Sequence, residues 1–439
     1  MTKVNGLNEE NPSANNNCIS TCTSTCEKPI YSIQNMVMNN RGSEKMIRGL
    51  DIDNSIKNLD ESLKKLQKFK KNPEGKNELI DNLEQKNLQP KAYLDIVSSN
   101  IPTDLISEEN YEEIKGIAGH FRGGLTSFFG FEASLMDSQP RSDYLFAISS
   151  NFNEREELLN ILERNGLPES LLEKRVWTNV KTFTKKWSKK DTTINNNILG
   201  LWFEFDASNK KRDAKIPGVF THTISIKKDS DINWIVDDLL PLIKGKEASY
   251  KLKSKITDCV KNLPQDSSIY QIGIMLQREC NDIRLVIKRI NHNEIIPYLK
   301  SIGWNDESEK IESLMKDLEK YCSRMVLHIS VGEKVDNKIG LECSFYPDED
   351  NQNEKWRKFF DFLVKNKYSK SDKIESILNF PGVEYDYGIS DDEEAITKMT
   401  ETPLNKKIIR FISHVKISYE PHSKIKSKAY FGVRNVPYN

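Results

Sequence analysis

Ten short stretches of the chain alternate apolar with polar residues, and they come in consecutive pairs. Residues 198–206 (ILGLWFEFD) and 282–290 (DIRLVIKRI) are examples. A period of two places every second side chain on the same face, as in a β-strand with one buried face. Between the pairs lie stretches with apolar residues every three or four positions, the period of an amphipathic helix. Residues 308–322 and 354–368 show this helical period clearly. Two strands followed by two helices therefore recur along the chain.

This recurring order predicts an α+β fold built on one large sheet. The predicted strands are residues 125–136, 142–150, 198–206, 219–226, 268–278, 282–290, 324–332, 338–346, 411–420 and 426–434. An open antiparallel sheet with one face in solvent is the alternative, but ten strands in an open sheet tend to curl or split, whereas closure removes the edges. We expect a ten-stranded antiparallel barrel of five αββα units, from about Leu125 to Arg434, with helices outside and a polar lumen.

The strand face opposite the apolar one carries an unusual mixture of residues. Charged side chains share it with Trp, Tyr, Met and His, unlike the Lys, Glu and Thr of a solvated sheet. Its predicted members include Glu132, Ser134, Trp202, Glu204, Asp206, His222, Gln271, Met275, Arg284, Lys288, Arg324, His328, Ser330, Lys338, Glu342, Ser344, Tyr346, His414, Lys416, Ser418, Lys426, Lys428 and Tyr430. Side chains just fill a barrel of eight strands, so ten strands leave room for a ligand. We expect a solvated lumen, lined by cations, that holds a ligand.

The N-terminal part of the chain differs from the rest in composition. Residues 1–53 are rich in Asn, Ser and Thr and contain Cys18, Cys22 and Cys26, and they have too few large apolar groups to offset the entropy of ordering. We expect a disordered leader there. Residues 54–120 show helical spacing and predict a helical extension, and residues 121–439 form the barrel domain. The C-x₃-C-x₃-C spacing is an incomplete zinc ligand set.

Charge and composition narrow the classes of protein. The 65 basic residues equal the 65 acidic ones, so no excess charge steers the chain onto nucleic acid or an anionic membrane. No apolar run is long enough to span a bilayer, and the N-terminus lacks the apolar core of a signal peptide. Seven cysteines, an odd number, suit reduced thiols. We expect a cytoplasmic protein, monomeric and without a nucleic-acid partner or membrane span.

Five αββα units that close into a ten-stranded barrel resemble the PT barrel, the fold of aromatic prenyltransferases of the dimethylallyltryptophan-synthase group. The resemblance covers roughly residues 80–439 and is mainly topological. Its closest local counterpart is Lys426-Ser-Lys428-Ala-Tyr430-Phe, which is similar to the Lys-x-Tyr pattern that lines the diphosphate pocket in that family. The spacing is not kept elsewhere, since Arg284 and Lys288 have no Tyr beside them and Lys416 is followed by Ser418.

The resemblance implies transfer of an isoprenyl group from an allylic diphosphate to an aromatic or peptide acceptor inside the lumen. Fixed cations stabilise the charge that grows on a departing diphosphate, and aromatic faces stabilise an allyl cation. Carried over to this chain, the diphosphate ligands are Arg284, Lys288, Lys416 and Lys428, the shields are Tyr346 and Tyr430, and Trp202 stacks on the acceptor or prenyl chain. Glu132 is the candidate base, with Glu204 behind it. His328 and His414 are candidates for binding phosphate or moving a proton.

Other enzyme classes find no support in the sequence. The chain has no P-loop, no G-x-S-x-G, no H-E-x-x-H and no dinucleotide glycine fingerprint. It also lacks the aspartate-rich magnesium motif, because residues 391–394 (DDEE) lie in a loop and Asp237-Asp238 lie alone on a helix. We expect no required cofactor and no metal site, with Mg²⁺ left as an option. Two alternatives remain open, namely a diphosphate-dependent cyclase or lyase on the same fold, and a non-catalytic barrel that binds a peptide or small anion.

Overall fold

The computed structural model describes residues 89–437, apart from 122–123, 126–127, 151–152, 165–166, 173, 208–214, 279–280, 307, 348 and 386–405. The expectations for the leader at residues 1–53, for its three cysteines and for residues 54–88 of the extension lie outside the described residues. The same holds for the acidic loop at 391–394. The barrel itself is described over all ten of its strands.

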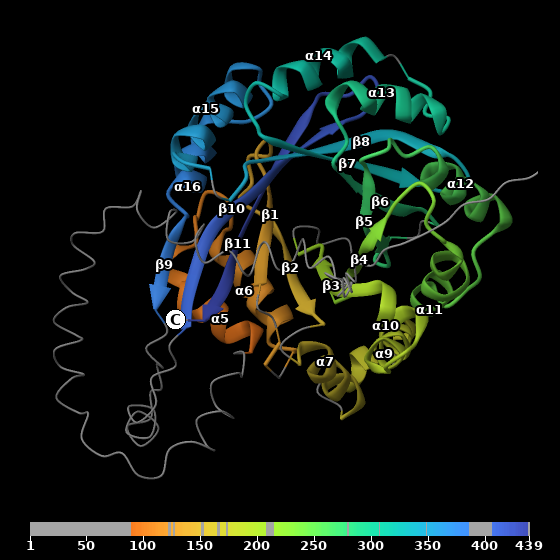
Figure 1. Cartoon of the computed structure of the whole chain (residues 1–439). Helices are drawn as coiled ribbons and strands as arrows, with labels where there is room; N and C mark the ends of the chain where they lie inside the picture. Colours follow the sequence, from red (N-terminus) through yellow and green to blue (C-terminus); the bar gives the residue numbers. More distant parts are fainter. Residues whose placement is uncertain are drawn as a thin grey trace, which may run out of the picture.

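Ten antiparallel strands form a closed ring, as the alternating pattern predicted (Figure 1). They are β1 Phe128–Ser134, β2 Ser142–Ser149, β3 Ile198–Phe205, β4 Gly218–Ile226, β5 Ser268–Met275, β6 Ile283–Lys288, β7 Arg324–Val331, β8 Val335–Ser344, β10 Lys406–Tyr419 and β11 Lys426–Pro437. Each strand pairs with the next in this order, and β11 closes the ring by pairing with β1. The expected α+β barrel is confirmed.

The alternation of side chains divides the two faces of the barrel wall. On β6, Ile283, Leu285 and Ile287 are fully buried in the main hydrophobic core, which lies between the strands and the helices. Arg284 and Lys288 therefore face the opposite way, into the lumen. The same parity holds on β3, where Leu201 and Phe203 join the core while Trp202 lines the lumen. The apolar face is on the outside of the barrel, because the helices cover it there.

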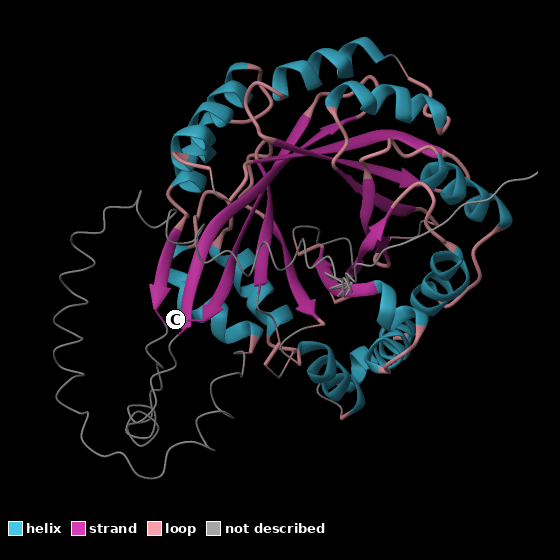
Figure 2. Cartoon of the chain, viewed as in Figure 1, coloured by secondary structure: helices cyan, strands magenta, loops and turns pink. Residues whose placement is uncertain are grey.

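Helices surround the strands on the outside of the ring (Figure 2). They are α5 Pro90–Val97, α6 Glu108–Ala118, α7 Glu154–Glu163, α8 Glu169–Leu172, α9 Arg175–Ser188, α10 Thr193–Asn197, α11 Leu240–Lys244, α12 Tyr250–Lys261, α13 His292–Ser301, α14 Ser308–Leu318, α15 Gln352–Lys365 and α16 Ile374–Leu378, with short turns η1 Ser98–Asn100, η2 Ile235–Leu239 and η3 Ser371–Lys373. Their apolar stripes explain this position. On α15, for example, Trp356, Phe359, Phe360 and Leu363 are buried. No helix among the described residues is long and apolar enough to cross a membrane.

Two details of the sheet differ from the sequence prediction. A short strand, β9 Gly382–Tyr385, precedes the undescribed acidic loop and pairs with Lys407–Arg410 of β10. The sequence placed these residues in a loop, because four residues are too few to show a period. The predicted eighth strand, residues 338–346, was displaced toward the C-terminus, since β8 spans Val335–Ser344 and Tyr346 lies beyond it, 51% exposed. Lys338 is likewise exposed at the outer end of β8, where it pairs with Glu420.

Candidate active site

The barrel encloses a cavity of about 870 Å³, a volume that suits a small organic ligand. Side chains from all ten strands of the ring contribute to its wall. Eight of the residues predicted for the site line it, namely Trp202, Glu204, Lys288, His328, Tyr346, His414, Lys416 and Tyr430. At one end the cavity reaches exposed residues, including Arg289 and Tyr346, so it is open there. The structure thus brings most of the predicted site residues to one enclosed space.

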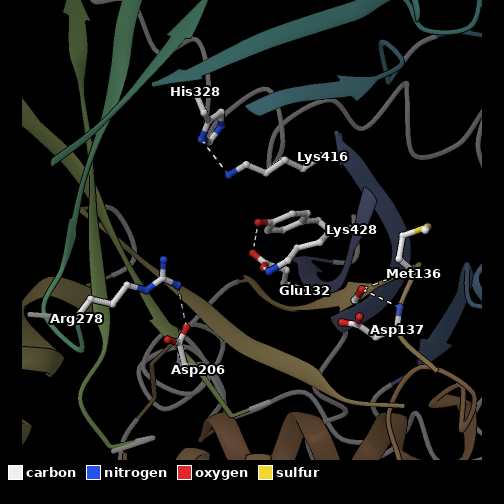
Figure 3. Close-up of polar contacts among 10 residues, drawn as sticks. Glu132, Met136, Asp137, Asp206, Arg278, His328, Lys416 and Lys428 are labelled. Atoms are coloured by element: carbon white, nitrogen blue, oxygen red, sulfur yellow. Dashed lines mark hydrogen bonds and ion pairs between the residues drawn. The ribbon is translucent and has the colours of Figure 1, made fainter. Parts of the chain in front are cut away.

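Glu132 is held in the lumen by two partners from the neighbouring strand. It stands on β1 directly opposite Tyr430 of β11, and Lys428 lies two residues further along β11. The ammonium group of Lys428 and the hydroxyl of Tyr430 each donate to one carboxylate oxygen of Glu132. Figure 3 shows Lys428 and Glu132 meeting in this way. Lys428 is therefore committed to a carboxylate, which reduces its capacity to hold a diphosphate.

The two lumen carboxylates of the first and third strands differ in their acidity. Burial would raise the pKa of Glu132, but the charges of Lys428 and Lys416 outweigh it and lower the pKa to about 2. No cation among the described residues forms an ion pair with Glu204, so burial, followed by repulsion from Glu132, raises its pKa to about 7. Two carboxyl groups with separated pKa values can take different roles. Glu204 is the one suited to exchange a proton near neutral pH.

Lys416, on β10, belongs to a polar cluster that the sequence did not reveal. Its Nζ lies 3.2 Å from Nδ1 of His328 (Figure 3). Nε2 of the same imidazole lies 2.5 Å from Oε1 of Glu342, and Nε2 of His414 lies 3.3 Å from that oxygen. The ring of His414 stacks on Tyr430 with centroids 4.2 Å apart. Four strands, β7, β8, β10 and β11, thus supply one connected set of side chains.

Acid–base equilibria in this cluster follow from its burial. Burial lowers the pKa of His328 to about 4, so its imidazole is neutral at pH 7. Glu342 is also buried, but the two histidines keep its pKa well below the usual range, and it is ionised. Burial and then the charge of Arg284 lower the pKa of Lys416 to about 8. Lys416 therefore carries its charge at neutral pH but loses it in mild base.

Arg284 and Lys288 face the same lumen but belong to different groups of charges. Arg284 forms no ion pair with any residue that the structure describes, and its charge acts on Lys416 and Glu204. Lys288 lies four residues further along β6, roughly 13 Å away at about 3.3 Å per residue. The charge of Arg284 acts on Lys416, whereas the charges that act on Lys288 are those of Arg289 and Arg324.

We call the open end of the cavity the cationic mouth, defined by Tyr270, Lys288, Arg289, Arg324 and Tyr346. Lys288 lies over the ring of Tyr270 at 5.2 Å, and Arg324 lies over that of Tyr346 at 5.5 Å. Burial, followed by the charges of Arg289 and Arg324, lowers the pKa of Lys288 to about 8. The positive charges of Lys288, Arg289 and Arg324 together attract anions to this entrance.

Part of the lumen wall is aromatic. Phe128, Ala147 and Phe411 form an apolar cluster separate from the main core, and Trp202 and Leu145 pack against it. Trp202 meets Phe128 edge to face with centroids 4.8 Å apart. The indole N–H of Trp202 is buried without a hydrogen-bond partner among the described residues. Such a wall offers π faces to an aromatic ring or a carbocation.

Several lumen residues were placed on the polar face by the alternation but were not recognised as site residues. Glu342 and Arg324 are the clearest, and Asp143, buried opposite Glu132, was missed altogether. Asp143 is the second residue of β2, a strand for which no lumen-facing residue was predicted. Alternation places a side chain on a face, but it does not say which residues of other strands it contacts. The link between Glu342 and His414 spans 72 positions of the sequence and has no local signal.

Comparisons with known proteins give a likeness of fold. No family model matches the chain, and no curated protein matches its sequence. Among solved structures, the chain is similar to AnaPT from Neosartorya fischeri, at 10% identity and a TM-score of 0.45 over 80% of this chain and 96% of that one. It is similar to 6-dimethylallyltryptophan synthase from Micromonospora olivasterospora in complex with DMASPP and Trp, at 11% identity and a TM-score of 0.44, over 78% and 97% of the two chains. It is also similar to 5-dimethylallyltryptophan synthase from Streptomyces coelicolor, at 9% identity and a TM-score of 0.40 over 78% of this chain and 94% of that one.

Proposed function

We propose that this protein transfers an isoprenyl group from an allylic diphosphate to an aromatic acceptor within the barrel lumen. One observation carries the proposal: the guanidinium of Arg284, which has no ion-pair partner among the described residues, and the ammonium of Lys416 act on each other in a barrel lumen whose wall is partly aromatic. Guanidinium and ammonium groups suit phosphate oxygens, and aromatic faces suit an allyl cation. The lumen therefore offers both halves of such a substrate a matching surface.

In the proposed reaction the C–O bond of the allylic diphosphate breaks and its electron pair leaves with the diphosphate. Arg284 and Lys416 stabilise the charge that grows on that oxygen. A carbon of the acceptor ring attacks the allyl carbon, and the proton on the ring carbon then passes to the carboxylate of Glu204. Glu204 suits this step because its pKa of about 7 lies near physiological pH. Glu132 was the first candidate for this base, but its ion pair with Lys428 makes it a poor proton acceptor.

The proposal assigns no resident metal to the protein. Among the described residues, no three His, Cys, Asp or Glu side chains are grouped so that they can hold a metal ion. A diphosphate substrate binds Mg²⁺ in solution, so the assay is run both with Mg²⁺ and with EDTA. The acceptor is proposed only as an aromatic ring, free or in a peptide.

Pyrophosphate release tests the proposal. The full chain is incubated with dimethylallyl, geranyl and farnesyl diphosphate, each with and without tryptophan, tyrosine and peptides that contain them. Release that depends on an acceptor, with a prenylated product in the mass spectrum, is the expected result. Release without an acceptor assigns the lumen to a diphosphate cyclase or lyase instead, and no release with any substrate overturns the proposal. Arg284→Met should abolish the release, whereas Arg357→Met, which removes an exposed arginine paired with Glu375, should not.

A further inference from the structure

Glu342 occupies a singular place in the lumen because one of its oxygens meets two imidazoles. Oε1 lies 2.5 Å from Nε2 of His328 and 3.3 Å from Nε2 of His414. The side chain of Glu342 is 13% exposed, and that of His328 is 8% exposed. Neither Nε2 atom makes a well-aligned hydrogen bond, so both contacts are close approaches of an imidazole nitrogen to the carboxylate. The carboxylate therefore joins β7 and β10 from its own position on β8.

The contacts fix the proton positions in this cluster. An ammonium group can only donate, so Nδ1 of His328 accepts from Lys416, 3.2 Å away. A neutral imidazole then carries its proton on Nε2, where it faces the carboxylate of Glu342. For His414, Nδ1 lies 3.0 Å from the hydroxyl of Ser413 and Nε2 again faces Glu342. Nε2 of each imidazole faces the carboxylate, so it is the nitrogen that we expect to carry a proton.

We propose that Glu342 is the positioning residue of the lumen. Through His328 it fixes the ammonium group of Lys416 as a donor toward a bound diphosphate, and through His414 it holds the ring that stacks on Tyr430. The link to a diphosphate rests on the proposed function, whereas the link to the imidazole tautomers does not. Glu342 need not touch the substrate, because it acts through the two histidines.

The environment of Lys416 gives this role a pH dependence. The charged or titratable groups that act on it are Arg284 on β6, Glu342 on β8, Glu132 on β1 and Glu204 on β3, and His328 on β7 contacts it directly. Of these, Arg284 disfavours the ammonium form, whereas the three carboxylates favour it. Removing the charge of Glu342 should therefore let Lys416 lose its proton at lower pH. Anion binding that relies on this ammonium must then weaken at lower pH as well.

The first test needs no substrate. Nitrogen NMR of protein labelled at its histidines reports which ring nitrogen carries the proton, and His328→Gln and His414→Gln assign the two signals. We expect wild-type His328 to be neutral and protonated at Nε2, and Nε2 of His414, which faces Glu342, to carry a proton. In Glu342→Gln at least the His328 signal should move toward the Nδ1-protonated form or a mixture. An unchanged His328 tautomer in Glu342→Gln overturns the positioning role, whatever the protein catalyses.

The second test measures pyrophosphate binding by calorimetry from about pH 6 to pH 9. Wild-type affinity should fall as the pH rises through about 8, the pKa of Lys416. In Glu342→Gln the affinity should be roughly tenfold weaker at pH 7.5, as expected when a charge-assisted hydrogen bond loses its alignment, and the fall should begin at lower pH. His328→Asn, which cannot reach Glu342, should behave alike, and the double variant should be no weaker than the weaker single variant.

A matched control separates positioning from a general loss of charge. Glu333→Gln removes a carboxylate from the β7–β8 turn, where Glu333 pairs with the exposed Lys251 on the surface, and should leave the binding curve unchanged. If Glu342→Gln does not fold, as judged by circular dichroism, His328→Asn alone carries the test. Additive effects of the two variants overturn the inference. Failure of wild-type protein to bind pyrophosphate overturns the proposed function instead, while the tautomer result still decides the role of Glu342.

Discussion

The carboxyl groups of Glu132 and Glu204 face one lumen from the first and third strands, and the charge of the first raises the pKa of the second. Each carboxyl group therefore titrates in its own pH range. Glu132 stays ionised down to about pH 2, whereas Glu204 changes its charge at about pH 7. Two glutamates that both point into the lumen thus have chemically different carboxyl groups.

Glu204 and Lys416 together predict a bell-shaped dependence of kcat/KM on pH. Glu204 must lose its proton to act as a base, so the rate should rise with pH through about 7. Lys416 must keep its proton to bind the diphosphate, so the rate should fall as the pH passes about 8. A profile of kcat/KM against pH checks this, and Glu204→Gln should lose the acidic limb. A flat profile between about pH 6 and pH 9 would contradict both assignments.

Replacing either carboxylate by its amide should distinguish base from structural partner. Glu204→Gln keeps the shape but removes the proton acceptor, so turnover should fall by roughly a hundredfold while diphosphate affinity changes little. Glu132→Gln should affect folding more than it affects the proton transfer. Single-turnover measurements give the rate of the chemical step for both variants. Equal turnover of Glu204→Gln and wild type would return the role of base to Glu132 or to a histidine.

The ion pair of Glu132 with Lys428 should contribute to stability in a pH-dependent way. The folded-state pKa of Glu132 is depressed to about 2, so its contribution is complete above the unfolded value near 4.5 and is lost as the pH falls through about 2. Glu132→Gln should lower the free energy of unfolding at pH 7 by about 1 to 3 kcal/mol. The lower part of this range applies because the side chain of Lys428 is 41% exposed. Urea unfolding at pH 7 and at pH 3 measures the difference, which should shrink at the lower pH.

Alanine variants of the inner cations should differ in their effect on the diphosphate. Arg284→Ala and Lys416→Ala each remove a group that is free to bind an anion, so affinity should fall roughly tenfold to a hundredfold. Lys428→Ala should have a smaller effect on affinity, because Lys428 is already paired with Glu132. Calorimetry with a non-hydrolysable allylic thiolodiphosphate compares the three. A loss for Lys428→Ala as large as the other two would show that the pair opens when the substrate binds.

The lumen width depends on a contact between Gly273 and Phe220, which face each other across β4 and β5. A Cβ on Gly273 would lie 2.3 Å from the ring of Phe220, so any side chain there must push the ring aside. We expect Gly273→Ala to shift product formation toward the shortest prenyl donor and Phe220→Ala to shift it toward longer ones. The relative kcat/KM for the three donors measures this. Identical donor preference in both variants would place the prenyl chain elsewhere.

Sequence and structure agree where side-chain alternation alone decides the outcome. Leu285 and Ile287 predicted the outer face of β6, and with it the inward direction of Arg284, because a strand has only two faces. Distance along a strand was harder to use. Arg284 and Lys288 share a face, but the rise per residue separates them into two groups of charge. The pairing of Glu132 with Lys428 depends on the register of two strands that are nearly 300 positions apart, which no local pattern contains.

β10, at 14 residues, is longer than its neighbour β8, and the two strands pair over only part of β10. It pairs with β11 from Lys406 to Ser418, but β8 meets it only from Val415 to Tyr419, and β9 takes the other end. The ring is thus closed at this junction by a single short ladder. Local opening begins where fewest hydrogen bonds must break together, so amide hydrogens of this ladder should exchange with deuterium before those between β10 and β11. Loosening of this ladder would bear directly on the lumen, because Glu342 and Lys416 lie opposite each other across it.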